Sequence, residues 1–330
     1  MNIKKNRIGL GTFPLASVFT RVTKKQAEGI VKTFLDNGGY YIDSAPLYGF
    51  GKVEELLGRV LRQYSRNKYF IITKCGYIDV VGKSFQTVKK SCKYKDVIRE
   101  CEKSLERLKV DSIDLYFVHS PDPTTPFDET MDALEKLQKD GKIREIGVSN
   151  VNLEELKGYN KKGKIEYIQN RFSLINRSIN EKFERYLVKN NIMLIPYQPI
   201  ERSQLSDRVS SEYNFRKGDL RIGRTDWEDV PFTVITKWVQ KYIAPIAKEK
   251  GVAVEQLVMA WELQQKYVGF VIPGATSEKQ VLTNSASDKV TLSKSNILKI
   301  GKAYYALEKM IKTKFSKTVR EFRGLNEKYY

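Results

Sequence analysis

Four residues whose side chains could together move a proton lie within the first 119 positions of the chain: Asp43, Tyr48, Lys74 and His119. A tyrosine phenol is a weak acid at neutral pH, and a nearby ammonium group favours its ionised form. An aspartate can hold that ammonium group in place, and a histidine can hydrogen-bond to a substrate carbonyl oxygen. These residue types indicate acid/base chemistry at a carbonyl, provided that the fold brings them together.

His119 is the only histidine in 330 residues, and it follows the apolar run Ile113–Val118. A single histidine at the end of a buried strand is more often a structural residue than a catalytic one. The catalytic interpretation gains weight because two other predicted strands end near Asp43 and Lys74, and charges that end apolar strands need partners. One histidine and three cysteines without C-x-x-C spacing do not indicate a metal site.

Short apolar segments alternate with amphipathic helical segments along most of the chain. This alternation is typical of parallel strands joined by right-handed helical crossovers. The predicted strands are Arg7–Gly11, Tyr40–Asp43, Tyr69–Lys74, Ile113–His119, Ile143–Ser149, Tyr167–Asn170, Ile192–Tyr197 and Val268–Ile272. The predicted helices are Thr23–Asn37, Val53–Gln63, Lys95–Leu108, Glu129–Lys139, Asn152–Tyr159, Ile179–Asn190, Thr233–Lys250, Val254–Gln265 and Ser277–Ser285, with Thr23 and Asp128 as N-caps.

Two α/β architectures fit about eight parallel strands: an open doubly wound sheet and a closed barrel. An open dinucleotide-binding sheet would carry G-x-G-x-x-G in its first strand–helix turn, and neither Gly9-Leu10-Gly11 nor Gly49-Phe50-Gly51 completes that motif. No linker rich in Gly, Pro or Ser divides the chain. We therefore predict a single (β/α)8 TIM barrel over residues 1–308, followed by a basic helical C-terminal extension over residues 309–330.

The net charge of +19 raises the question of an anionic partner. The segment Lys309–Arg323 holds six basic residues against one acid, so a nucleic-acid binder is one hypothesis. The other basic residues are spread along the chain, which favours a solvated surface over a nucleic-acid interface. No segment has the apolar length of a membrane span, and no N-terminal cleavage site is convincing. We expect a cytoplasmic protein, and the sequence does not specify its oligomeric state.

Five segments resemble motifs of the aldo-keto reductase superfamily, in the order in which that family carries them. They include its first signature, its lysine strand, the helix and strand that carry its histidine, and two later motifs. The segments are Ile42–Leu61, Ile71–Lys74, Ser104–His119, Gly141–Asn150 and Ile272–Asn284. The resemblance runs from about residue 8 to residue 287. It implies a (β/α)8 barrel that binds a nicotinamide cofactor without the G-x-G-x-x-G motif.

By this resemblance Tyr48 is the proton donor or acceptor, and Asp43 and Lys74 tune it. His119 orients the substrate carbonyl. The resemblance also assigns cofactor contacts to the first loop, to several strand ends and to a late segment: Gly11, Thr12, Phe13, Asp43, Ser149, Asn150, Gln169, Tyr197, Gly274, Gln280 and Asn284.

Most of these residues can be grouped by the part of the cofactor that they would contact. Ser149, Asn150 and Gln169 would hold the carboxamide of the nicotinamide. Tyr197 would stack on the nicotinamide ring. The three residues of the late segment would lie along the adenosine half.

The resemblance implies an NAD(P)H-dependent oxidoreductase that transfers a hydride between nicotinamide and an aldehyde, ketone or sugar lactol. NADPH is the expected cofactor and NADH the alternative, because Gly274–Ser277 lacks the basic residue that many members place against the 2′-phosphate. Lys279 could substitute for it. The loop Pro199–Asp207 also departs from the family pattern, and Gln198 replaces a usual serine. A second hypothesis is a regulatory subunit of the channel-associated kind, which binds the cofactor but turns over little.

Overall fold

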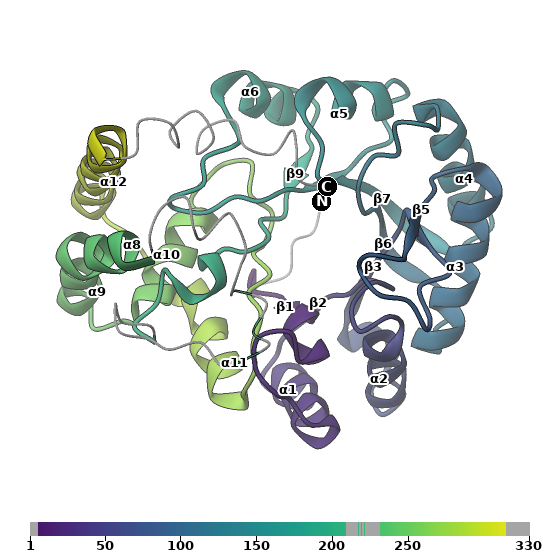
Figure 1. Ribbon diagram of the computed structural model, residues 1–330, viewed down its shortest axis with the longest axis horizontal. Helices are drawn as coiled ribbons and strands as arrows, with labels where there is room; N and C mark the ends of the chain where they lie inside the picture. The colour runs from purple at the N-terminus through teal and green to yellow at the C-terminus, as the bar shows by residue number, and fades with distance from the viewer. Residues whose placement is uncertain (1–5, 209–216, 218, 220, 222–231, 315–330) are drawn as a thin grey trace.

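Parallel strands form a ring at the centre of the molecule, with helices around its outside (Figure 1). The computed structural model describes residues 6–208, 217, 219, 221 and 232–314. Within them, one seven-stranded sheet has the order β1-β2-β3-β6-β7-β8-β9, and each neighbouring pair is parallel. Its strands are β1 (Leu10–Gly11), β2 (Tyr41–Asp43), β3 (Phe70–Cys75), β6 (Ile113–Val118), β7 (Ile143–Ser149), β8 (Tyr167–Gln169) and β9 (Met193–Leu194).

The segment 268–274 closes the ring between the two edge strands. It pairs in parallel on both sides, through the bridges Leu194 with Val268, Ile8 with Val271 and Gly11 with Gly274. The Arg7 guanidinium strengthens this junction by donating to the carbonyl oxygens of Gly269 at 2.8 Å and Val268 at 2.5 Å. The segment takes the eighth position of the ring, so the predicted (β/α)8 barrel is confirmed.

The helices surround the ring, and several begin at side-chain caps. At α1, Thr23 accepts from the backbone N–H of Gln26, whose side chain accepts from Thr23 N–H, so the predicted cap is confirmed. The α-helices are α1 (Lys24–Asp36), α2 (Lys52–Leu61), α3 (Tyr94–Leu108), α4 (Phe127–Lys139), α5 (Leu153–Tyr159), α6 (Glu181–Lys189), α8 (Phe232–Trp238), α9 (Ala244–Glu249), α10 (Val254–Leu263), α11 (Glu278–Ser285) and α12 (Lys294–Lys314). Shorter helical turns are η1 (Phe13–Ala16), η2 (Arg66–Lys68), η3 (Glu201–Ser203), η4 (Val239–Ile243) and η5 (Ala286–Lys289).

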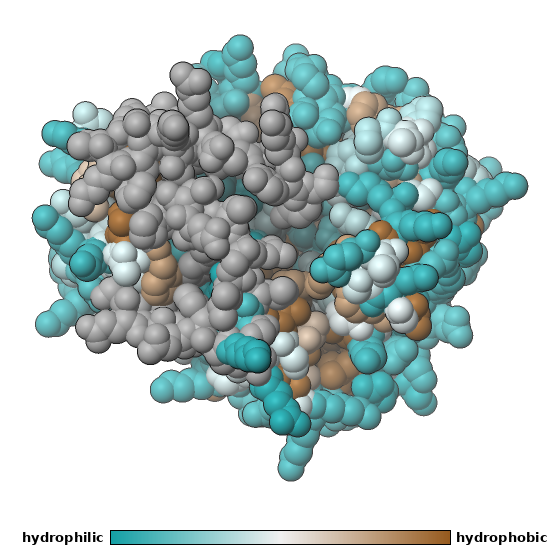
Figure 2. All heavy atoms as spheres, viewed as in Figure 1, coloured by the Kyte–Doolittle hydropathy of each residue, from teal (hydrophilic) through white to brown (hydrophobic). Residues whose placement is uncertain are grey.

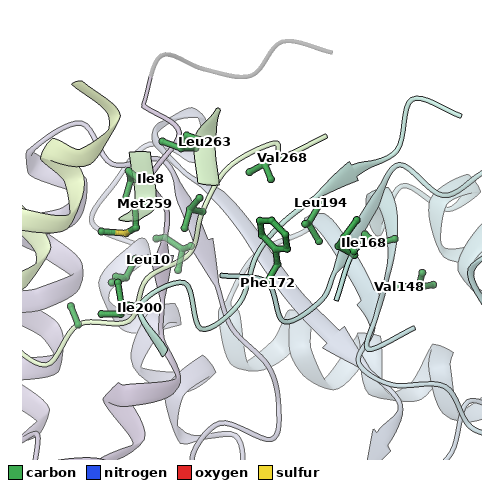
Figure 3. Packing of buried hydrophobic residues seen from close by; sticks show 14 of the residues in the cluster. Ile8, Leu10, Val148, Ile168, Phe172, Leu194, Ile200, Met259, Leu263 and Val268 are labelled. Atoms are coloured by element: carbon green, nitrogen blue, oxygen red, sulfur yellow. The ribbon is translucent and has the colours of Figure 1, made fainter. Parts of the chain in front are cut away.

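Alternation along each strand separates two buried layers. Residues of one parity fill the inside of the ring, where Tyr41 stacks on Phe270 with ring centroids 3.9 Å apart. Residues of the other parity face the helices in a larger apolar layer, which includes Ile168 and Leu194 (Figure 3). The inner layer also packs tightly: a Cβ on Gly147 would lie 2.3 Å from the Phe117 ring. This packing fixes the register of β6 against β7 near the carboxyl ends of the two strands.

Several predicted elements are corrected by the structure. Asp128 does not cap α4, because the helix begins after Pro126 without a side-chain cap. The predicted helix 233–250 is divided into α8, a π-helical turn and α9, with Pro245 at the start of the last piece. The strand predicted over 192–197 is reduced to β9, and 268–272 forms bridges only.

One hairpin was not predicted, and one helix was predicted only in part. A hairpin of β4 (Tyr77–Ile78) and β5 (Lys89–Lys90) follows β3, and its strands pair antiparallel. The helix α12 runs through the predicted domain limit at residue 308 and continues to residue 314. The remainder of the predicted basic extension, 315–330, lies outside the described residues.

Candidate active site

Three of the predicted catalytic residues, Asp43, Lys74 and His119, come to one end of the ring. Each lies two residues beyond a side chain of the inner layer on its own strand, so each points to the same side as that layer. On β3, Ile72 lies inside the ring and Lys74 is two residues further along. Asp43 and His119 stand in the same relation to Tyr41 and Phe117. All four predicted catalytic residues lie at the carboxyl ends of strands β2, β3 and β6 or on the loop after β2. In parallel barrels, this is the end at which catalytic groups gather.

Lys74 is the centre of this cluster. The residue is 1% exposed, and Nζ donates to Asp43 Oδ1 at 2.8 Å and to the Ser44 carbonyl oxygen at 2.7 Å. Nζ also lies 3.4 Å from the Tyr48 hydroxyl oxygen. Burial lowers the pKa of Lys74, and the Asp43 carboxylate acts against that shift. The arrangement places a paired cation against a phenol.

The loop that carries Tyr48 leads into α2, and a buried acid of this helix holds it in place. Glu54 is fully buried, and its Oε1 accepts from Thr73 Oγ1 at 2.6 Å, while its Oε2 accepts from Arg107 Nε at 2.7 Å. Thr73 precedes Lys74 and faces the opposite side of β3. Glu54 therefore links the helix after the Tyr48 loop to the strand that carries Lys74 and to α3.

The His119 ring lies edge-on to two tyrosines. Its centroid is 6.1 Å from that of Tyr48 and 5.3 Å from that of Tyr77. Removal of the ring from water, followed by the charges of Lys74 and Lys90, holds the pKa of His119 well below its usual value. The imidazole is therefore neutral at pH 7. A neutral imidazole beside a phenol suits hydrogen bonding to a carbonyl oxygen better than it suits general-acid work.

The predicted carboxamide-binding residues form one connected group across β7, β8 and the segment after β9. Ser149 Oγ donates to the Gln169 carbonyl oxygen at 2.7 Å, and Gln169 Nε2 donates to Asp43 Oδ1 at 2.8 Å. Asn150 Nδ2 donates to the His119 carbonyl oxygen at 2.8 Å, and Asn150 Oδ1 accepts from the Tyr197 hydroxyl at 2.7 Å. This group joins the predicted nicotinamide pocket to both Asp43 and His119.

The first loop approaches the same cluster from β1. Thr12 is fully buried, and both its backbone N–H and its hydroxyl donate to the Asp43 carbonyl oxygen, at 3.0 and 2.8 Å. Phe13 packs against Tyr48, with ring centroids 5.1 Å apart. A Cβ at Gly11 would lie 2.8 Å from the Ile272 carbonyl oxygen, so the ring's closure requires glycine there.

Two residues of the late segment, Gln280 and Asn284, lie on α11, and Gly274 lies in the segment before that helix. Gln280 Oε1 accepts from the Thr276 backbone N–H at 2.7 Å. Asn284 Nδ2 lies 3.4 Å from the Gly274 carbonyl oxygen, and Asn284 Oδ1 accepts from Arg208 Nη2 at 3.4 Å. Sequence reasoning did not single out Arg208, and the available signal was a basic residue directly after the atypical loop.

The side chains present fit a nicotinamide cofactor. A carboxamide needs both donors and acceptors, and the linked Ser149, Asn150 and Gln169 supply both. Gln198 follows Tyr197 in the chain, and its buried Oε1 accepts no hydrogen bond from the described residues. A buried oxygen without a donor is a group to which a polar ligand could donate a hydrogen bond. In the described part of the chain, no group of acidic, cysteine or histidine side chains is arranged to hold a metal.

Two further features lie near the cluster. The hairpin β4–β5 carries Tyr77 and Lys90 over the His119 side of the site, and sequence reasoning did not assign either residue a role. Hydrophobic periodicity could not identify strands of two residues. The lysines within residues 83–90 were the signal that the sequence contained for this segment. None of the described helices combines the length and the apolarity that a membrane span would require.

Comparisons with known proteins identify a family. The model of the Aldo/keto reductase family matches residues 7–304. The aldo-keto reductase YhdN of Bacillus subtilis is 31% identical, over 84% of this chain and 84% of its own. The NADH-specific methylglyoxal reductase of Escherichia coli is 27% identical, over 93% of this chain and 97% of its own.

Solved structures show the same fold. A glycerol dehydrogenase from Gluconobacter oxydans superposes with a TM-score of 0.78 at 29% identity, covering 93% of this chain and 91% of its own. An aldo-keto reductase from Klebsiella pneumoniae in complex with NADPH gives a TM-score of 0.69 at 25% identity, covering 90% of each chain. The family match spans nearly the whole barrel, including all four residues of the cluster. The chain therefore belongs to the aldo/keto reductase family.

Proposed function

We propose that this chain catalyses hydride transfer between a nicotinamide cofactor and the carbonyl carbon of an aldehyde, ketone or sugar lactol, with Tyr48 as the general acid or base. The observation that carries this proposal is the contact of Lys74 Nζ with both Asp43 Oδ1 and the Tyr48 hydroxyl, at 2.8 and 3.4 Å, beside the His119 ring. It is the arrangement required to protonate an oxygen that gains negative charge.

In this mechanism the bound cofactor supplies or accepts the hydride. For carbonyl reduction, His119 aims the substrate by a hydrogen bond to its carbonyl oxygen, and Tyr48 gives its hydroxyl proton to the same oxygen. Lys74 stabilises the negative charge that then develops on the phenol oxygen. Asp43 keeps Lys74 charged and oriented, and the same steps run in reverse for alcohol oxidation.

NADPH is the proposed cofactor, with NADH as the alternative. The solved relative from Klebsiella pneumoniae supports NADPH, and the relative from Escherichia coli, named as NADH-specific, supports the alternative. Ser149, Asn150 and Gln169 would hold the carboxamide and Tyr197 the ring face, with Gly274, Gln280 and Asn284 along the adenosine half. Gly11, Thr12 and Phe13 would border both cofactor and substrate.

The substrate is a small carbonyl compound or sugar, and a cytoplasmic location is part of the proposal. Three free, buried thiols are compatible with a reducing compartment. The hypothesis of a regulatory subunit is not favoured, because the named relatives are reductases and a dehydrogenase. We propose no nucleic-acid partner, because none of the contacts described at the site indicates nucleic-acid binding.

The test is Tyr48→Phe, which removes the transferable proton and keeps the ring. We expect kcat for a good aldehyde substrate to fall by about 10²- to 10⁴-fold. The dissociation constant for NADPH, measured by fluorescence titration, should stay within about twofold, because the cofactor contacts do not depend on the hydroxyl. Tyr94→Phe, on the exposed start of α3, is the matched control. Unchanged turnover in a folded Tyr48→Phe protein would refute the mechanism.

A further inference from the structure

The hairpin β4–β5 places a second lysine beside the catalytic cluster. Its strands begin directly after β3 and pair Tyr77 with Lys90, and the backbone N–H of Ser91 donates to the Gly76 carbonyl oxygen at 3.0 Å. Tyr77 presents its ring to the His119 ring, with centroids 5.3 Å apart, and Lys90 Nζ lies 5.7 Å from the Tyr77 centroid. The three side chains form a row in which Tyr77 contacts both His119 and Lys90.

The charge of Lys90 is not matched by an acid in the described part of the chain. Its Nζ donates to two neutral acceptors, Ser120 Oγ at 3.0 Å and the Pro121 carbonyl oxygen at 3.3 Å. The carboxylate of Asp122 is close in sequence, but it accepts from Thr124, Thr125 and the backbone of Cys92 instead. Lys74, by contrast, is paired with Asp43. Lys90 therefore leaves an unneutralised positive charge beside Tyr77 and the segment that follows His119.

Lys90 lies away from the residues to which the cofactor contacts are assigned. The proposed carboxamide and adenosine contacts come from β7, β8 and α11, and those of the first loop and Asp43 come from β1 and β2. The hairpin contacts the ends of β3 and β6 instead, through Tyr77 against His119 and Lys90 against Ser120. The field of Lys90 reaches the catalytic group, because its charge contributes to the lowered pKa of His119. Figure 2 shows hydrophobic residues gathered on this face above α2, near the connection between β4 and β5, where Val81 and Phe85 are exposed.

We propose that Lys90 is an anion-binding subsite, so that the preferred substrates carry a carboxylate or phosphate group close to the reacting carbonyl. This inference rests on the proposed carbonyl chemistry and names its substrate class. A half-buried ammonium with only neutral partners gains a charge-assisted hydrogen bond when such a group arrives. The excess of basic residues over the whole chain adds long-range attraction for the same substrates.

The test compares two pairs of aldehydes that differ in charge. In the first pair 4-carboxybenzaldehyde is anionic, and methyl 4-formylbenzoate is neutral with a similar ring. In the second pair glyceraldehyde 3-phosphate is set against glyceraldehyde, which separates phosphate from carboxylate recognition. Lys90→Met removes the charge, Lys90→Arg restores it, and Lys89→Met is the control on the exposed side of the same strand.

We expect Lys90→Met to lower kcat/KM by about tenfold for at least one anionic aldehyde and by less than about twofold for its neutral partner. Lys90→Arg should recover most of the loss, Lys89→Met should behave as the wild type, and the wild-type preference should shrink as salt is added. Equal losses for the charged and neutral members of both pairs, or no loss for either anion, would overturn the subsite.

A binding measurement separates this inference from the proposed function. The dissociation constant of each anionic aldehyde is measured by calorimetry with NADP⁺ bound, so that no reduction occurs. Binding weakened by Lys90→Met without turnover in any variant would support the subsite and reject the proposed reaction. Turnover with binding that is indifferent to Lys90 would support the reaction and reject the subsite.

Discussion

The ammonium nitrogen of Lys74 lies 3.4 Å from the hydroxyl oxygen of Tyr48, although the two residues are 26 positions apart in the chain. The same nitrogen is held from the other side by Asp43 Oδ1 at 2.8 Å. A buried cation is costly unless a nearby anion compensates it, and here one carboxylate provides that compensation. The cation is therefore fixed where it can stabilise negative charge on the phenol oxygen.

Lys74→Met should lower kcat by about 10²- to 10⁴-fold, because the developing phenolate loses its counter-charge. Steady-state kinetics across pH measures the effect, and the remaining activity should move to more alkaline pH. The single variant also leaves Asp43 buried without a cation, which should destabilise the fold by about 3–5 kcal/mol. Asp43→Asn/Lys74→Met should recover stability in urea unfolding but not activity. Recovery of activity in the double variant would contradict the assigned role of Lys74.

The single histidine makes its protonation directly measurable. The pKa of His119 is held well below 6.5, so its ring signal in NMR should not titrate between pH 8 and pH 6. In the unfolded chain the histidine gains a proton as pH drops below about 6.5, whereas in the folded chain it does not. The free energy of unfolding therefore falls with decreasing pH, by up to about 1.4 kcal/mol per pH unit. His119→Gln should remove this contribution to the slope. A ring signal that titrates near pH 6.5 in the folded protein would disprove the assignment.

Asn150 should matter through both its backbone and its side chain. Its φ is 57°, and the side chain joins the His119 carbonyl oxygen to the Tyr197 hydroxyl. Asn150→Gly keeps the backbone conformation and removes both hydrogen bonds, so NADPH affinity should fall by about tenfold in fluorescence titration. Asn191→Gly is the matched control, because Asn191 has a φ of 55° and is exposed. Equal NADPH affinity in the two variants would argue against a cofactor role for the Asn150 side chain.

Glu145 lies at the opposite end of the ring from the catalytic cluster. Burial, followed by the charge of Glu166, raises the pKa of Glu145 to about 7, and its Oε2 has no hydrogen-bond partner among the described residues. Between about pH 4.5 and pH 7 the folded state therefore keeps a proton on Glu145 that the unfolded state releases. The free energy of unfolding falls as pH rises through this range. Glu145→Gln should stabilise the fold by about 1–3 kcal/mol at pH 8 in urea unfolding and by almost nothing at pH 4. Glu106→Gln, at an exposed acid on α3, should not reproduce this pH dependence.

The sequence predicted the elements best where the pattern was long. The strand 143–149 was predicted with its observed bounds, and most helices were placed to within two residues, because apolar periodicity identifies long amphipathic segments. The hairpin β4–β5 was missed because strands of two residues carry no periodic signal. The division of 233–250 was missed because a π-helical turn depends on packing against its neighbours rather than on local preference.

By itself, the sequence determined the residue types and their order: an acid, a phenol, an ammonium and an imidazole, each after an apolar strand or a short turn. Alternation along the strands then required Asp43, Lys74 and His119 to follow the parity of the inner layer. Only the tertiary structure decided that Lys74 contacts Tyr48 and that Lys90 lies beside Tyr77 and His119. The reason is physical: strand register and ring closure are set by packing between segments far apart in the chain, and no local pattern encodes those distances.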